Sequence, residues 1–117
     1  MSKSATRGTK VVLQNAKTTG NGDAIAIPSS FKDHTFYVIG NGAVGAGAIT
    51  FETADNPEYT GTWMALVNDL ATPTANPLTI TANAELIYKI KGVFAALRAR
   101  ISTTVTVGTV TVEYLGS

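Results

Sequence analysis

The sequence predicts an all-β fold, an antiparallel two-sheet β-sandwich with about eight or nine strands. Apolar and polar residues alternate with period two over the last quarter of the chain, and turn residues recur at the close spacing typical of sandwiches and barrels. So many short strands in one flat sheet would leave a large apolar face in water, and two facing sheets remove that problem. A jelly-roll-like topology is favoured over an immunoglobulin-like one, because Trp63 lies mid-chain and the cysteine pair of immunoglobulin domains is missing.

The alternation is clearest from Phe94 to Leu115, which is predicted to be a hairpin with its turn at Gly108. Successive strand side chains point to opposite faces, so Arg98 and Arg100 are expected to face outward. The residues expected to face the core are Leu97, Ala99, Ile101, Val110, Val112 and Tyr114. A strand this regular at the end of the chain is part of the fold.

The remaining strands are read from shorter apolar runs between turn signals. Asn41-Gly42 is a strong turn signal, expected to separate two of them. A helix between Ala84 and Arg100 is the alternative, because that stretch is rich in helix formers. The expected segments are 10–16, 24–27, 34–40, 43–53, 62–67, 78–82 and 86–90.

At 117 residues the chain is expected to form one domain over residues 10–117, preceded by a flexible, polar arm over residues 1–9. The arm lacks the apolar stretch of a secretory signal, and no apolar run is as long as a membrane span. These features predict a protein made in the cytoplasm that has no membrane partner.

The composition favours a protein that works through interfaces with other proteins. Hydrophobic residues make up 44% of the chain, but charged residues only 15%, well below the average of globular domains. A surface of threonine, alanine and glycine costs little charge desolvation when it is covered. The net charge of +1 argues against nucleic acid, since such partners need a basic patch; Lys3, Arg7 and Lys10 are the only basic cluster.

No catalytic pattern is present in the sequence. His34 adjoins Asp33 and follows Ser29 and Ser30, but nothing resembles a nucleophile elbow. A histidine that enters a strand from a loop is expected to be a surface or hydrogen-bonded residue. The chain is therefore predicted not to be an enzyme.

No cofactor or metal is predicted either. One histidine and no cysteine exclude an ordinary zinc site. Asp55, Asn56 and Glu58 offer oxygen ligands of the kind calcium takes, but they lack the dense alternation of a calcium loop and read as a solvated turn.

Two pairs of side chains are candidates for binding a partner. Tyr59 and Trp63 flank Gly61, and they are either an aromatic platform for sugar or, for Trp63, the large core residue that a small sandwich needs. Arg98 and Arg100 either pair with acidic groups of a neighbouring subunit or lie on a solvated sheet face with Glu113 opposite.

Three stretches of the chain resemble the small β-sandwich virion proteins of tailed bacteriophages, a group that includes head decoration or cement proteins and tail or neck components. They are 94–102, 108–116, and Gly61-Thr62-Trp63 after Ile49-Thr50-Phe51-Glu52. The resemblance covers residues 34 to 116 and lies in the alternation of apolar and polar residues along the strands and in these short motifs. It implies a protein without enzymatic activity that binds the assembled capsid, often as a dimer or trimer.

The sequence therefore predicts a structural virion protein, foremost a capsid decoration or cement protein that binds the major capsid protein. A tail or neck component and a carbohydrate-binding module are the alternatives. Attachment is expected through strand edges, outward threonine faces and an arm that orders on its neighbour. The predicted interface residues are Lys3, Arg7, Lys10, Tyr59, Trp63, Arg98 and Arg100.

Overall fold

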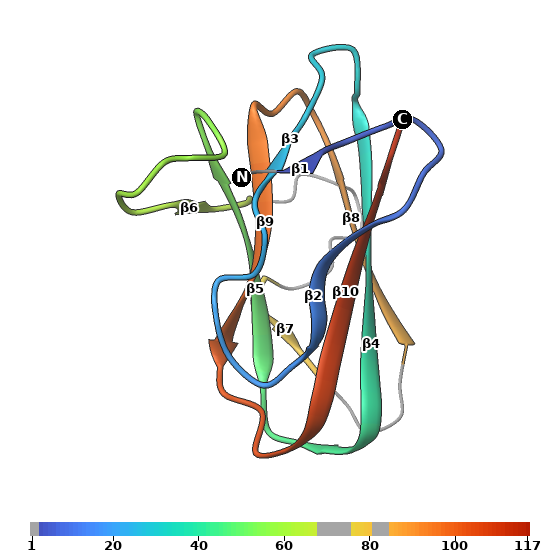
Figure 1. The fold of residues 1–117 in the computed structure, drawn as a ribbon, viewed down its shortest axis with the longest axis vertical. Helices are drawn as coiled ribbons and strands as arrows, with labels where there is room; N and C mark the ends of the chain where they lie inside the picture. The colour runs from blue at the N-terminus through green and yellow to red at the C-terminus, as the bar shows by residue number, and fades with distance from the viewer. Residues whose placement is uncertain (1–2, 68–75, 81–84) are drawn as a thin grey trace.

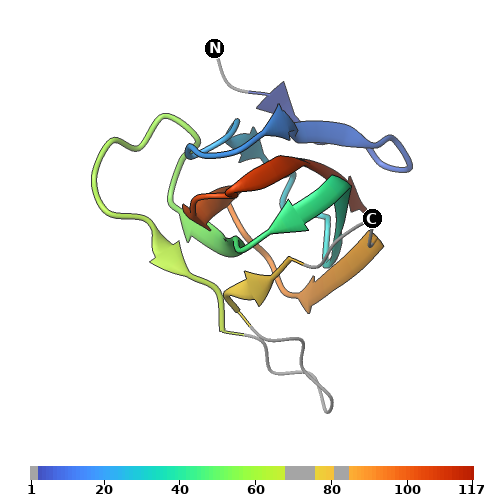
Figure 2. The ribbon, with the colours of Figure 1, turned by 90° about the horizontal axis from the view of Figure 1, so that it is seen from below.

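Two β-sheets face each other across a single hydrophobic core (Figures 1 and 2). The computed structural model describes residues 3–67, 76–80 and 85–117, and the regular elements in these ranges are ten strands. Four of them are only two residues long. The strands are β1 (Lys3–Ser4), β2 (Val11–Lys17), β3 (Ile25–Ala26), β4 (Asp33–Gly45), β5 (Ala48–Ala54), β6 (Met64–Ala65), β7 (Leu78–Thr79), β8 (Glu85–Lys91), β9 (Ala96–Thr103) and β10 (Val107–Gly116).

The strand order is that of a jelly roll. One sheet, here called the B sheet, runs β2-β10-β4-β8, and the other, the A sheet, runs β1-β3-β9-β5-β6, with β7 also paired to β5. β6 and β7 pair with opposite ends of β5 and together occupy one strand position. Counted from β2, the sheets then have the jelly-roll orders 1-8-3-6 and 2-7-4-5. The predicted β-sandwich is confirmed, and its topology is jelly-roll-like.

Aromatic rings join the two sheets at the centre of the core. Phe51 of β5 stacks on Tyr88 of β8, with ring centroids 4.1 Å apart and planes 11° apart. Phe36 of β4 lies 4.8 Å from Phe51, between centroids. All six residues of the C-terminal stretch predicted to face inward are buried. Period-two alternation therefore predicted the core-facing residues correctly.

The predicted C-terminal hairpin is wrong. β9 pairs with β3 and β5 in the A sheet, whereas β10 pairs with β2 and β4 in the B sheet. The chain crosses between sheets at residues 104–106, where Val105 N–H donates to Thr18 O at 2.9 Å. Gly108, at φ +74°, lies inside β10. Alternation reports which face a side chain takes, but it carries no information about the neighbouring strand.

The turn predicted at Asn41-Gly42 is also wrong, because β4 continues to Gly45. Asn41 and Gly45 pair with Thr109 and Val107, so four steps on β4 match two on β10. Gly42 supplies its positive φ of 84° to this irregularity, and the chain reverses after it at Ala46 and Gly47. A glycine in a strand pattern marks a bulge as readily as a turn.

Residues 3–9 of the predicted arm lie on the sandwich rather than away from it. β1 pairs in parallel with β3, and the Ala5 N–H donates to Ala26 O at 2.9 Å. Ala5 is buried, and the Gly8 N–H donates to Gly116 O at 3.4 Å. A short backbone pairing of this kind needs no side-chain alternation, so the sequence pattern did not reveal it.

The helical alternative for 84–100 is replaced by β8 and β9 in the described residues. Nowhere in the described ranges is there a helix of the length and apolarity needed to cross a membrane. The predicted loop residues 68–75 and Ala82 of the predicted sixth strand lie outside the described residues.

Candidate functional site

The outer face of the A sheet carries a cluster of charged and aromatic side chains, here called the Arg–Trp cluster: Glu52, Trp63, Arg98 and Arg100. Phe51 and Ala99 point into the core, so the neighbouring side chains on β5 and β9 point outward. Glu52 lies directly across from Arg98 in the strand pairing. The alternation of two central strands thus places an acid between two bases.

Glu52 holds both arginines. Its Oε1 accepts from Arg98 Nε at 2.8 Å, and its Oε2 accepts from Arg100 Nε at 3.1 Å. Glu52 is only 4% exposed, and a carboxylate this buried needs such partners. Two guanidinium groups around one carboxylate leave the cluster with one net positive charge.

Trp63 packs on Arg98. The Arg98 guanidinium carbon lies 4.5 Å from the centroid of the Trp63 ring, a cation–π arrangement. The indole N–H donates to Tyr59 O at 3.0 Å, which fixes the ring against the 55–62 loop. Trp63 is 5% exposed, as a core residue would be, but it lies on the outer face of the sheet and outside the core cluster.

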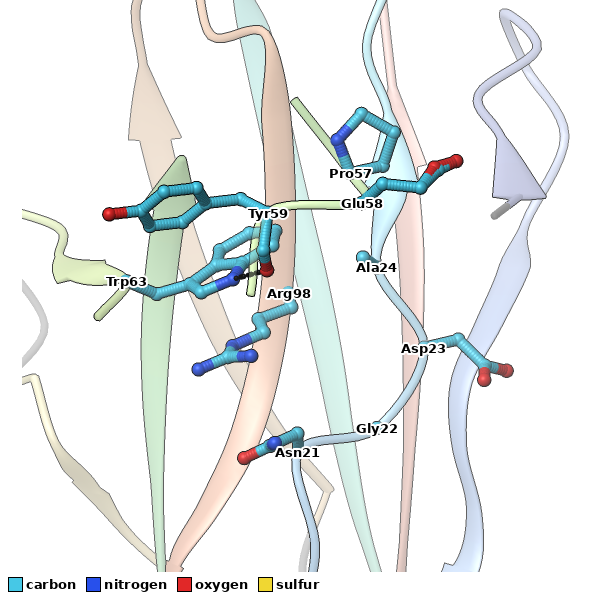
Figure 3. A pocket seen from close by; sticks show the side chains of 9 residues that line it. All are labelled: Asn21, Gly22, Asp23, Ala24, Pro57, Glu58, Tyr59, Trp63 and Arg98. Atoms are coloured by element: carbon cyan, nitrogen blue, oxygen red, sulfur yellow. Dashed lines mark hydrogen bonds between the residues drawn. The ribbon is translucent and has the colours of Figure 1, made fainter. Parts of the chain in front are cut away.

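A pocket of about 290 Å³ opens beside this cluster, between the 21–24 and 57–59 segments. Figure 3 shows the Arg98 guanidinium beneath the Trp63 indole and near Asn21 of the opposite loop. The pocket is lined by Asn21, Gly22, Asp23, Ala24, Pro57, Glu58, Tyr59, Trp63 and Arg98. A second hollow of about 320 Å³ shares Tyr59 with the first and reaches Met64 on β6.

Exposed apolar side chains also lie on β6 and in the segments on either side of it. Tyr59 is 43% exposed, Met64 71% and Val67 87%. Aromatic residues, methionine and arginine are the residue types enriched in protein–protein interfaces, and this corner of the A sheet combines all three.

Four of the seven predicted interface residues meet here, namely Tyr59, Trp63, Arg98 and Arg100. The other three contact different parts of the sandwich. Lys3 Nζ donates to Val12 O at 2.5 Å and pairs with Asp23 at 2.9 Å. Arg7 lies 4.9 Å from the Phe31 ring centroid, and Lys10 lies 5.1 Å from that of Tyr37.

Glu52 is the residue that sequence reasoning missed. Glu113, considered as the acid opposite the arginines, lies on β10 in the other sheet. Glu52 is 46 residues away from Arg98 in sequence, and only the pairing of β5 with β9 joins them. Its one sequence signal is its position next to Phe51, which puts it on the outward face of a central strand.

His34 is a buried structural residue, only 1% exposed. Its ring nitrogens lie 2.6 Å from Tyr114 Oη (Nδ1) and 2.8 Å from Gly92 O (Nε2). Because the carbonyl only accepts, Nε2 carries the proton and the Tyr114 hydroxyl donates to Nδ1. Burial lowers the pKa of His34, although the Gly92 carbonyl and Asp33 oppose this.

Burial also raises the pKa of Tyr114, so the pair is neutral. Both ring nitrogens of His34 are thus used within the fold, and neither contacts Ser29 or Ser30.

Asp55, Asn56 and Glu58 lie in a turn that is held by hydrogen bonds among its own residues. Asn56 Nδ2 donates to Asp55 Oδ1 at 3.1 Å, and Asn56 Oδ1 accepts from the Glu58 N–H at 2.9 Å. In the parts of the chain that the structure describes, no three acidic or histidine side chains gather as a metal site would require.

The fold defines the chain as a jelly-roll β-sandwich protein. A similar solved structure is the crystal structure of the SPBc2 prophage-derived protein YomS, with a TM-score of 0.66 over 93% of this chain and 92% of that one. The two sequences are 18% identical, so the likeness is one of fold. No protein-family model matches the chain, and no curated protein does.

Proposed function

We propose that the chain is a structural protein of a phage particle, a capsid decoration protein that binds the head shell. The Arg–Trp cluster and the apolar β6 edge beside it carry this proposal. The sequence resemblance to tailed-phage virion proteins and the likeness in fold to a prophage-derived protein support the phage origin. The role is one of binding, without catalysis or a cofactor, and the protein works in the virion.

The cluster is suited to docking because its side chains are already held in place. Glu52 fixes both arginines, and Arg98 in turn covers Trp63. A partner therefore meets side chains that lose little conformational freedom on binding. Arg100, whose side chain is 36% exposed, directs the remaining positive charge towards an acidic group of the shell.

Apolar contact supplies the rest of the attachment. Met64 is largely exposed and lines a hollow together with Tyr59, so a shell protein that fills this hollow would cover both, and Val67 is exposed two residues after β6. Contacts of modest strength are sufficient on a shell that repeats the same site many times, provided that the decoration protein is itself oligomeric.

The position of Trp63 disfavours the carbohydrate-binding alternative. A sugar platform needs an open aromatic face, but Trp63 is buried and Arg98 covers its ring. Only Tyr59 of the two predicted platform residues is substantially exposed.

The test is co-sedimentation of purified protein with empty heads of the phage that encodes it. Wild-type protein should sediment with the heads, and Met64→Asp and Arg100→Glu should each reduce binding at least about tenfold, the effect of a central interface residue. Lys17→Glu, on β2 of the B sheet, is the matched charge control and should bind normally.

Binding to isolated tails but not to heads would replace decoration by a tail or neck role. Binding to neither particle, with retention on a glycan column, would overturn the proposal in favour of a sugar-binding module. The neighbourhood of the gene gives an independent check, since a decoration protein is expected beside the major capsid protein.

A further inference from the structure

Two polar side chains that line the pocket beside the Arg–Trp cluster have hydrogen-bond donors without an acceptor among the described residues. Arg98 has five N–H donors, and the structure gives a hydrogen bond only to its Nε, which Glu52 accepts. The side-chain amide of Asn21 makes no hydrogen bond within the described ranges. Figure 3 shows the Arg98 guanidinium and the Asn21 amide on the same side of the pocket. Their donors therefore serve a common space.

The charge around the Arg98 guanidinium favours an anion in that space. The Glu52 carboxylate is shared between two arginines, so the cluster keeps one net positive charge. Asp23 is paired with Lys3 at 2.9 Å, and Figure 3 shows the Asp23 and Glu58 carboxylates turned away from Arg98. The Arg98 side chain is only 15% exposed, so salt screens an anion bound there less than one on the open surface.

A carboxylate matches the donors of the pocket. The planar guanidinium presents N–H groups in a fixed fork, which two carboxylate oxygens accept together, and such charge-assisted bonds are stronger than neutral ones. The amide N–H of Asn21 can add a further donor. Trp63 packs on the guanidinium and Glu52 holds its Nε, so its direction is set before any ligand binds.

The walls of the pocket favour an amino-acid side chain as the carrier of the carboxylate. Pro57, Tyr59 and Trp63 supply ring carbons along which the methylene groups of a glutamate can pack. The volume of about 290 Å³ is at the lower end of the range for small-molecule pockets. Tyr59 also lines the second hollow, which reaches the exposed Met64, so the residues next to the acid would cover Met64.

We propose that this pocket is a carboxylate-binding site, in which the Nη groups of Arg98 and the amide of Asn21 hold an aspartate or glutamate side chain of a partner protein. The guanidinium is fixed in advance, so little conformational freedom is lost when the acid binds. The identity of the partner as a shell protein rests on the proposed function. The site itself does not, because it is tested on the purified chain alone.

An internal carboxylate tests the site without a ligand. Asn21→Asp puts a carboxylate in the lining of the pocket, where Arg98 should bind it. The equilibrium constant of unfolding, measured in urea, should fall about two- to fivefold, the strength of a partly exposed ion pair. In an Arg98→Ala background the same substitution should give no such gain. Asn15→Asp, exposed on β2 of the B sheet, is the matched charge control and should have the same effect in both backgrounds.

A blocked amino acid tests the class of ligand. N-acetyl-glutamate methylamide is titrated into the wild-type chain, and N-acetyl-glutamine methylamide, which has the same shape without the charge, is the control. The NMR signals of the Arg98 Nε–H and the Trp63 indole N–H should shift and reach saturation. The glutamine probe should bind at least about threefold more weakly. Asn21→Asp should abolish the response to the glutamate probe, because its own carboxylate takes the same donors.

Four results would overturn the proposal. They are a loss of stability in Asn21→Asp, an equal effect of Asn21→Asp with and without Arg98, equal binding of the two probes, and tighter binding of inorganic phosphate than of the glutamate probe. The last of these would assign the pocket to phosphate instead of a carboxylate.

Head binding separates this inference from the proposed function. Asn21→Asp should sediment with heads less than Asn15→Asp does, and equal sedimentation would exclude the shell protein as the source of the acid. If the wild-type chain binds the glutamate probe but no heads, the proposed function is lost and the site stands. If it binds heads but neither test finds a carboxylate site, this inference is lost and the proposed function stands.

Discussion

Two polar clusters in the described part of this protein, His34–Tyr114 and the Arg–Trp cluster, differ in charge and in solvent exposure. His34 and Tyr114 lie in the core of the sandwich, and the Nε2–H of His34 ends the network at the Gly92 carbonyl. Glu52 joins two arginines on the outer face of the A sheet, and Arg100 stays partly exposed. The first cluster is a neutral, closed network that holds the fold together. The second carries excess charge towards solvent, as a docking surface requires.

Glu52→Gln is the substitution expected to have the largest effect on stability. The change removes the only carboxylate that either arginine contacts in the described residues, and it leaves two guanidinium groups close together. We expect a loss of about 2–3 kcal/mol in the free energy of unfolding, less than for a fully buried pair because Arg100 is partly solvated. Urea denaturation measures it.

Glu113→Gln on β10 is the control for Glu52→Gln and should change the midpoint little. An equal loss in both variants would mean that the cluster adds nothing beyond an ordinary surface glutamate.

Tyr114→Phe is expected to have the next largest effect on stability. The ring stays in the core, but His34 Nδ1 loses its donor and becomes an unsatisfied buried acceptor. That should cost about 1–2 kcal/mol in the free energy of unfolding, measured by urea denaturation. Tyr37→Phe, on the outer face of the B sheet, should cost less than about 0.5 kcal/mol. If Tyr114→Phe left the free energy of unfolding unchanged, it would contradict the closed His34–Tyr114 network.

The pH dependence distinguishes the neutral cluster from the charged one. His34 has a lowered pKa in the folded protein, so below about pH 6.5 the unfolded chain binds a proton that the folded chain does not. The free energy of unfolding should therefore fall as the pH falls from 7 to 5, by at most about 1.4 kcal/mol per pH unit.

Because His34 is the only histidine, His34→Gln should flatten this slope, and the ring signals of His34 can be followed by NMR. A folded-state titration at or above pH 6.5 would show that the ring is not held neutral.

The smallest expected effect comes from Arg98→Ala. Its loss opens one face of Trp63 and removes one of the two partners of Glu52, whose carboxylate keeps Arg100, so it should cost about 1 kcal/mol. Trp63 is the only tryptophan, so its fluorescence emission should move to longer wavelength. Arg100→Ala is the matched variant and should leave the emission unchanged. Identical spectra for the two variants would argue against the packing of Arg98 on the indole.

Sequence reasoning located much of the candidate site but not its organisation. Arg98 and Arg100 were placed on an outward face because Leu97 and Ala99 are apolar neighbours in a strand. Tyr59 and Trp63 were identified as the aromatic residues of one loop region. Their proximity to the arginines followed from no pattern, because it depends on how the loop after β5 folds back over the A sheet.

The sequence by itself determined which side chains face the core, because alternation with period two is a local property of an extended chain. It also determined the all-β class and, through composition, a weakly charged surface. The tertiary structure decided which strands are neighbours: it separated β9 from β10 and brought Glu52 to Arg98 across 46 residues. The physical reason is that an apolar face can be buried by any facing sheet, whereas an ion pair or a strand edge depends on one particular neighbour.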